Sequence, residues 1–102
     1  MPNFALTLVH GSGWDDSRGI RQQPDWVEHA AFMDALVASG FILLGGPLGD
    51  GQRTLHVVEA HDDQEVRRRL ADDPWARAGL LEVGLVQPWA LWLDFRNNLP
   101  TC

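Results

Sequence analysis

Residues 3–9 form a predicted strand that is apolar on both of its faces. Its larger side chains alternate with smaller ones, in the order Phe4, Ala5, Leu6, Thr7, Leu8 and Val9. A strand of this kind needs cover on both faces, because water would otherwise contact one apolar row. The chain has 102 residues, which is enough for one domain (residues 1–102) with little left for a second covering layer.

The pattern along the chain predicts the order strand, helix, strand, strand, helix, strand. These elements are expected at residues 3–9, 24–39, 41–44, 54–60, 62–79 and 80–89, with a hairpin turn at 45–51. This order is typical of an α+β, ferredoxin-like βαββαβ fold, with a four-stranded antiparallel sheet and two helices on one face. Residues 90–102 are expected to form a short tail anchored by Trp92 and Phe95.

Local signals support these elements. In the first helix the apolar residues recur at helical spacing, at Trp26, Ala30, Met33 and Val37. Asp62 and Glu65 fit a capping box for the second helix, which Asp73-Pro74 then extends or restarts. In the last strand one face is expected to carry Leu81, Val83 and Leu85.

Two helices cover only one side of such a sheet, so the other side would expose a large apolar patch. A second copy of the chain is the simplest cover, packed sheet against sheet around a two-fold axis. We therefore expect a homodimer through the sheet face, with a barrel-like core.

Composition and charge exclude several classes of function. The net charge of -6 repels nucleic-acid phosphates, and no basic stripe is present. No apolar run is long enough to span a membrane, so we expect a cytoplasmic protein without a membrane partner. Cys102 is the only cysteine, and the histidines lack close metal-ligand spacing, so neither a metal nor a cofactor is expected.

His29 and Asp73 are the candidate catalytic residues. Histidine can give and take protons near neutral pH, and a carboxylate behind the imidazole fixes its tautomer. Each residue also has a purely structural interpretation: His29 could be a buried histidine bonded to a backbone carbonyl, and Asp73 could simply cap the helix that begins at Pro74. Asp72 is the alternative to Asp73 if the register differs by one residue.

Four segments, in this order and spacing, resemble the YCII-related (YciI-like) family of dimeric α+β barrel proteins. They are Glu28-His29-Ala30-Ala31-Phe32, Leu43-Leu44-Gly45-Gly46-Pro47, Ala71-Asp72-Asp73-Pro74-Trp75 and Val86-Gln87-Pro88-Trp89. The resemblance implies that the helix histidine and the aspartate before proline form a polar pair in the active site. At the matching positions of this chain these residues are His29 and Asp73.

The resemblance and the residues together indicate a small cofactor-free enzyme. It would transfer protons in an elimination or isomerisation of a small cyclic or aromatic metabolite. The candidate substrate-binding residues are His10, Trp14, Arg18, Arg21 and Trp75. Two other interpretations stay open, namely a non-catalytic domain that binds or senses a small molecule, and a structural dimerisation domain without a ligand.

Overall fold

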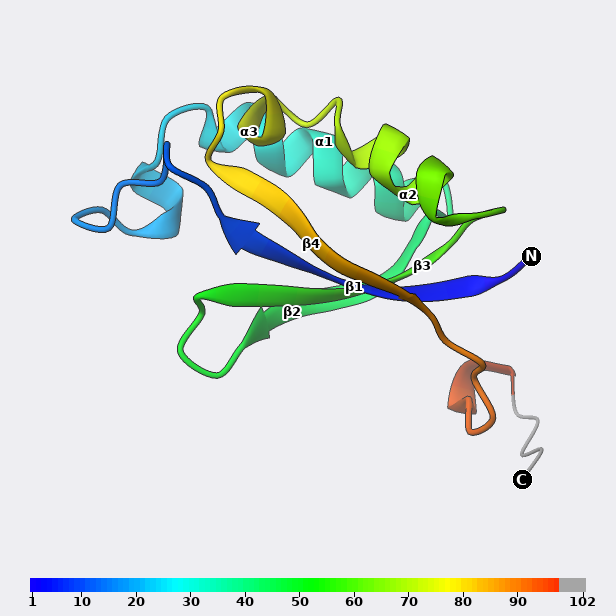
Figure 1. The fold of residues 1–102 in the computed structure, drawn as a ribbon. Helices are drawn as coiled ribbons and strands as arrows, with labels where there is room; N and C mark the ends of the chain where they lie inside the picture. Colours follow the sequence, from blue (N-terminus) through cyan, green and yellow to red (C-terminus); the bar gives the residue numbers. More distant parts are fainter. Residues whose placement is uncertain (98–102) are drawn as a thin grey trace.

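The chain folds as an α+β protein built on one four-stranded antiparallel sheet, and the computed structural model describes residues 1–97 (Figure 1). The spatial strand order is β2-β3-β1-β4, as in ferredoxin-like folds. The strands and main helices are β1 (Asn3–His10), α1 (Trp26–Ala38), β2 (Ile42–Leu48), β3 (Arg53–Glu59), α2 (Asp63–Leu70), α3 (Pro74–Arg77) and β4 (Leu81–Pro88). Short 3-10 helices occupy Ile20–Gln22 and Phe95–Asn97. The predicted element order is confirmed.

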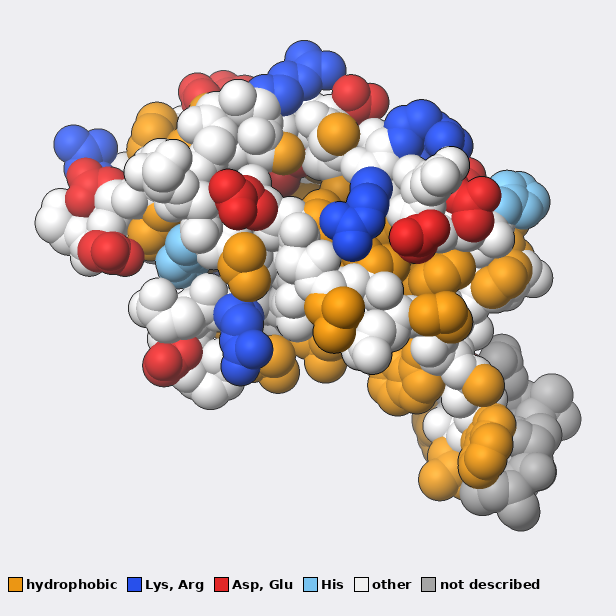
Figure 2. All heavy atoms as spheres, in the orientation of Figure 1, with side chains coloured by type: hydrophobic (Ala, Val, Ile, Leu, Met, Phe, Trp, Pro, Cys, Tyr) orange, Lys and Arg blue, Asp and Glu red, His pale blue; other side chains and the backbone are white. Residues whose placement is uncertain are grey.

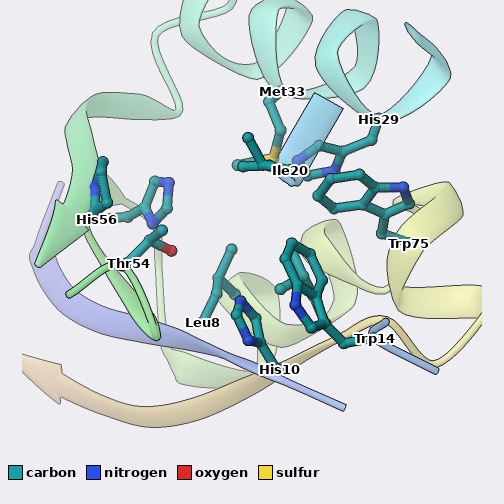
Figure 3. A pocket seen from close by; sticks show the side chains of 12 residues that line it. Leu8, His10, Trp14, Ile20, His29, Met33, Thr54, His56 and Trp75 are labelled. Atoms are coloured by element: carbon teal, nitrogen blue, oxygen red, sulfur yellow. The ribbon is translucent and has the colours of Figure 1, made fainter. Parts of the chain in front are cut away.

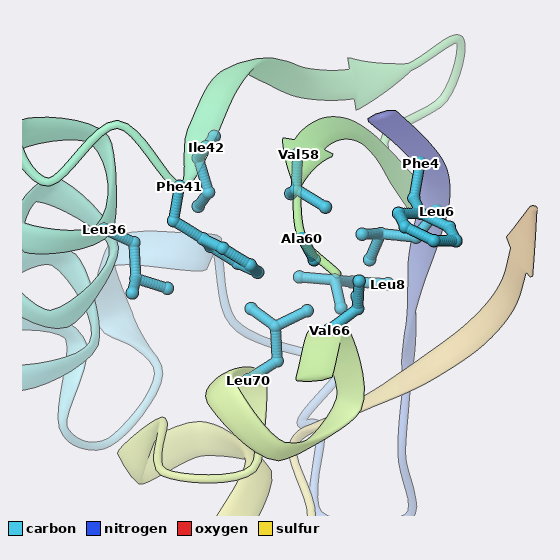
Figure 4. Close-up of a cluster of buried hydrophobic side chains, with 10 residues drawn as sticks. All are labelled: Phe4, Leu6, Leu8, Leu36, Phe41, Ile42, Val58, Ala60, Val66 and Leu70. Carbon is cyan, nitrogen blue, oxygen red and sulfur yellow. The ribbon is translucent and has the colours of Figure 1, made fainter. Parts of the chain in front are cut away.

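The helices lie on one face of the sheet, and the hydrophobic core fills the space between the two layers (Figures 1 and 4). Its buried members are Phe4, Leu6, Leu8, Leu36, Phe41, Ile42, Val58, Ala60, Val66 and Leu70. On β1 these are the even-numbered residues, as the alternation of large and small side chains predicts.

The opposite face of the sheet has no helix over it. The outward row of β1 consists of Ala5, Thr7 and Val9, and cross-strand pairing places Leu55 and Leu44 on the same side. Leu44 is exposed to solvent in the single chain. Figure 2 shows further hydrophobic side chains gathered over the end of β4 and the segment that follows it.

The predicted turn at 45–51 is wrong in its first half. Strand β2 continues through Gly45, Gly46 and Pro47 to Leu48, and the actual turn begins at Gly49. Glycine and proline are typical of turns, but β2 is an edge strand, where a proline without an N–H is tolerated. Gly49 and Gly51 have positive φ angles of 50° and 83°, which favour glycine at both positions.

The predicted face of β4 needs a correction at Leu85. Leu6 pairs with Val86 and Leu8 pairs with Val83, so β4 contains one extra residue between these two pairs. Such a bulge reverses the alternation, which puts Val86 against the core and leaves Leu85 64 % exposed.

Two smaller expectations also change. Val37 is exposed, because the buried stripe of α1 runs through His29 and Leu36. Phe95 is 96 % exposed, so it does not anchor the C-terminal segment within one chain. The remaining tail residues, 98–102, lie outside the described residues. Within residues 1–97, none of the helices has the length and apolar character needed to cross a membrane.

The core predicts a large difference between two identical substitutions. Val66→Ala should lower the free energy of unfolding by about 2–3 kcal/mol, because Val66 is fully buried and its lost methyl groups leave a cavity. Val27→Ala is the matched control: Val27 is exposed on α1, and its substitution should change stability by less than about 0.5 kcal/mol. Urea unfolding measures both values, and equal losses would contradict this description of the core.

Candidate functional site

A pocket of about 150 Å³ lies between the helices and one end of the sheet (Figure 3). It is lined by Leu8, His10, Trp14, Ile20, His29, Met33, Pro47, Gly51, Thr54, His56, Trp75 and Leu81. The wall is mostly apolar and aromatic, with a few polar side chains, which is the usual character of a small-molecule site.

His29 and Asp73 are in direct contact, although they are 44 residues apart in the sequence. Nδ1 of His29 lies 2.9 Å from Oδ1 and 2.8 Å from Oδ2 of Asp73. Both residues are buried, with exposed fractions of 7 % and 3 %. Because the carboxylate can only accept, Nδ1 donates the hydrogen, and Nε2, on the pocket side, is the nitrogen left to exchange a proton with a ligand.

The position of Asp73 follows from its role as the N-cap of α3. Its Oδ1 accepts a hydrogen bond of 3.0 Å from the backbone N–H of Trp75, and Pro74 occupies the first helical turn. The same carboxylate therefore caps a helix and holds an imidazole. Asp72, the alternative considered from the sequence, points elsewhere and forms an exposed ion pair with Arg77 at 3.1 Å.

Two parallel ring stacks form walls of the pocket. The rings of His29 and Trp75 lie 3.8 Å apart with an interplanar angle of 6°, and those of His10 and Trp14 lie 3.8 Å apart at 9°. Trp75 is fixed further by a 2.6 Å hydrogen bond from Nε1 to the carbonyl of Pro24. The edge of Trp14 meets Trp75, which joins the two stacks.

The connection between β1 and α1 is ordered, and it supplies Trp14 and Ile20 to the pocket. The buried side chain of Gln23 holds it together, since Nε2 donates to the carbonyls of Asp15 and Arg18 at 2.7 and 3.2 Å. Oε1 of Gln23 in turn accepts from the N–H of Asp15 at 3.1 Å. Gln23 could not be recognised from the sequence, because a lone glutamine in a loop belongs to no periodic pattern.

His56 lines the pocket from β3, and its environment differs from that of His29. Burial, and to a smaller degree the nearby charge of His29, lowers the pKa of His56 below its ordinary value of 6.5. Gly45 on the neighbouring strand leaves room for the ring, because a β-carbon there would lie 2.9 Å from both Cγ and Nε2 of His56. At neutral pH this imidazole is therefore uncharged.

The structure brings most of the predicted site residues together, but not the two arginines. His10, Trp14, His29 and Trp75 line the pocket, and Asp73 lies directly behind His29. Arg18 instead forms an exposed ion pair with Asp15 at 3.3 Å. The guanidinium of Arg21 lies 6.0 Å from the ring of Trp26, away from the pocket lining.

His56 and Thr54 were not among the predicted site residues. The alternation of side chains along β3 could have indicated them. Both residues are on the same face of the strand as the buried Val58, so this strand directs polar side chains inward at one end. The described residues contain no group of three or more His, Cys, Asp or Glu side chains placed to hold a metal ion.

Comparisons with known proteins agree with this architecture. The sequence profile of the YCII-related domain matches residues 21–90. The structure is similar to that of 5-chloro-2-hydroxyhydroquinone dehydrochlorinase from Burkholderia phenoliruptrix, solved in complex with 2,5-dihydroxybenzoquinone. The two sequences are 26 % identical, and the match covers 85 % of this chain and 93 % of that chain, with a TM-score of 0.62. No protein of curated function matches the chain.

The lowered pKa of His56 predicts a pH-dependent contribution to stability. Below pH 6.5 the unfolded chain binds a proton at this residue more readily than the folded chain, so acid destabilises the fold. Between pH 7 and pH 5 the free energy of unfolding should therefore fall less for His56→Gln than for the wild type. Urea unfolding at several pH values measures this difference. Thr54→Val, which alters the same wall without removing a titratable group, should keep the wild-type slope. Parallel slopes for His56→Gln and the wild type would show that the buried imidazole is not the cause.

Proposed function

This chain belongs to the YCII-related family, and on that premise we propose that it is a small enzyme that transfers protons with His29 and Asp73. The observation that carries the proposal is the buried imidazole with Nδ1 on a carboxylate and its other nitrogen on the pocket side. Such an arrangement provides a base with a fixed tautomer and a group that stabilises the imidazolium once it forms. The proposed chemistry uses these side chains and no cofactor.

The proposed reaction begins at a ring hydroxyl of the substrate. Nε2 of His29 takes the hydroxyl proton, and the O–H electron pair forms a carbonyl while the adjacent double bond shifts. In an elimination, the shifted electrons expel a leaving group from a saturated ring carbon, and the imidazolium later returns its proton to solvent. In an isomerisation there is no leaving group, and the imidazolium instead gives the proton to the carbon of the former double bond that receives the shifted electrons. Asp73 stays ionised throughout and balances the charge of His29.

The shape of the pocket favours a single flat ring as the ligand. A cavity near 150 Å³ is large enough for one six-membered ring, and the tryptophans offer aromatic faces and edges for it to contact. The structural neighbour is named as a dehydrochlorinase of a chlorinated hydroxyhydroquinone and was solved with a ring compound. We propose that His10, Trp14 and Trp75 hold the ring while His29 reacts with it. A substrate role for Arg18 and Arg21 stays a prediction, without support from the pocket lining.

Kinetics of variants tests the proposal. His29→Gln and Asp73→Asn should each lower kcat by a factor on the order of 10²–10⁴, because they remove the base or its partner. The affinity for ring ligands should change much less. The first substrate to assay is the chlorinated hydroxyhydroquinone of the neighbour, with chloride release as the readout. Asp72→Asn is the matched control, because this exposed neighbour of Asp73 makes no contact with His29.

Other outcomes would favour the rival function. If ring compounds bind, both site variants abolish that binding, and no halogenated or hydroxylated ring is ever converted, the chain is a small-molecule-binding domain. Turnover that survives both His29→Gln and Asp73→Asn unchanged would remove the pair from the mechanism.

We also propose that a second copy of the chain covers the open face of the sheet. The face carries aliphatic side chains, including Leu44 and Leu55, and the charged Arg53 and Glu82 lie beside Val9 at one end of it. An antiparallel sheet with one apolar face and no helix over it is stabilised by packing against another sheet. The oligomer would be a homodimer with both pockets on its outer layers.

Substitution of one central residue tests this dimer. Leu55→Glu should convert the dimer to a monomer in sedimentation experiments, since burying an unpaired carboxylate costs about 3–5 kcal/mol. Val27→Glu introduces the same charge on the exposed surface of α1 and should stay dimeric. A wild-type protein that sediments as a monomer at micromolar concentration would contradict the proposal.

A further inference from the structure

The far wall of the pocket contains polar side chains without hydrogen-bond partners. Nδ1 of His56 and Oγ1 of Thr54 are buried, and neither has a partner within residues 1–97. Both side chains line the pocket from β3, across it from His29 and Trp75 (Figure 3). Buried polar groups in folded proteins are nearly always hydrogen-bonded, so this pair is unusual.

The polar residues that are buried as a whole in the described chain follow that rule. Gln23 makes hydrogen bonds to the backbone of its loop, and His29 and Asp73 bond to each other. Two further buried atoms of the described chain lack a partner: Nδ1 of His10, which also lines the pocket, and Oδ1 of Asn3, at the start of β1. Three of the four unpartnered atoms therefore belong to the pocket lining. A ligand that brings polar atoms to the far wall would satisfy two of them.

The polar groups of this wall are best matched by an uncharged oxygen of a ligand. An uncharged imidazole has one N–H donor and one lone pair, and a threonine hydroxyl can also donate or accept. Either a hydroxyl or a carbonyl oxygen is a suitable partner for such groups. No arginine lines the pocket in the described part of the chain, so a carboxylate would have no cation to pair with there.

We propose that His56 and Thr54 bind a second oxygen substituent of the substrate ring, opposite the hydroxyl from which His29 takes a proton. This inference rests on the proposed function and narrows its substrate class to rings with two oxygen substituents on opposite sides. Hydroquinones and their hydroxy-keto tautomers belong to this class. With oxygen bound at both ends, the ring has one orientation in the pocket and its reacting hydroxyl is held at Nε2 of His29.

Gly45 of β2 allows the imidazole of His56 to occupy this position in the pocket wall. A β-carbon at this position would collide with the imidazole of His56, so the ring of His56 keeps its place only because β2 has a glycine opposite it. Gly45→Ala should therefore displace the imidazole while leaving all of its polar atoms in the protein.

Two ligands of nearly equal size test the proposal: hydroquinone and para-cresol, in which a methyl group replaces one hydroxyl. In NMR titrations of the full chain we expect hydroquinone to bind at least about tenfold more tightly than para-cresol. The double variant Thr54→Val with His56→Leu should reduce this ratio to near one, and Gly45→Ala should also reduce it. Met33→Leu, an apolar change in the α1 wall, should alter both affinities by a similar factor and keep the ratio.

An unchanged ratio in the double variant would overturn the inference, as would equal affinities for the wild type or no binding of either compound. Thr54→Val alone is nearly isosteric and keeps the test valid if the double variant fails to fold. A failure of the proposed function would give a different result. The His29→Gln variant would then retain chloride release, whatever the ratio of the hydroquinone and para-cresol affinities. If His29→Gln loses turnover but the His56 and Thr54 variants do not change the affinity ratio, the proposed enzyme function stands. Only the proposed role of His56 and Thr54 is then wrong.

Discussion

The hydrogen bonds between His29 and Asp73 are the interaction on which the arrangement of this site depends. A carboxylate that is 3 % exposed must have partners inside the protein, because burial without them costs several kcal/mol. Asp73 finds them in the imidazole of His29 and the backbone N–H of Trp75. One side chain therefore joins α1 to α3 and also begins α3.

This interaction belongs to a closed set of contacts around the pocket. Trp75, the second residue of α3, stacks on His29 and donates a hydrogen bond to Pro24, just before α1 begins. The region around α1 and α3 is thus linked by the hydrogen bonds of His29 to Asp73, by a ring stack and by a hydrogen bond from an indole N–H to a backbone carbonyl. Each contact restricts the rotation that the others leave free, so the imidazole is held in one orientation before any ligand arrives.

The sequence was sufficient where structure is decided by neighbouring residues. Helix starts at Asp62 and Asp73, and the face of β1, follow from capping and alternation, which are local rules. The extra residue beside Leu85 could not be predicted in this way, because cross-strand pairing with β1 decides where a bulge falls. The part of β2 from Gly45 to Pro47 could not be predicted for a related reason. Its composition is typical of turns, but its pairing with β3 makes it a strand.

The same difference explains which part of the candidate site was predicted. His29 and Asp73 lie in segments with strong local signals, and the family resemblance paired them. His56 had only the alternation of β3 to indicate it, because its place in the pocket also depends on the pairing of β3 with β2 and on the glycine opposite, which leaves space for the ring. Arg18 and Arg21 were selected by charge alone, and ion pairing and ring contacts nearby hold both side chains outside the pocket.

Along the sheet, the inward row of side chains changes from apolar to polar, and this change separates the core from the pocket. Phe4 pairs with Val58 at one end, whereas Leu8 pairs with Thr54 at the other, and β1 finishes at His10. Val66 and Leu70 of α2 complete the core over the apolar part, and α1 and α3 bring His29 and Trp75 over the polar part. Most of the apolar burial that stabilises the fold is thus in one half of the sheet. The polar side chains of the site are concentrated in the other half, so they take little away from the packing of the core.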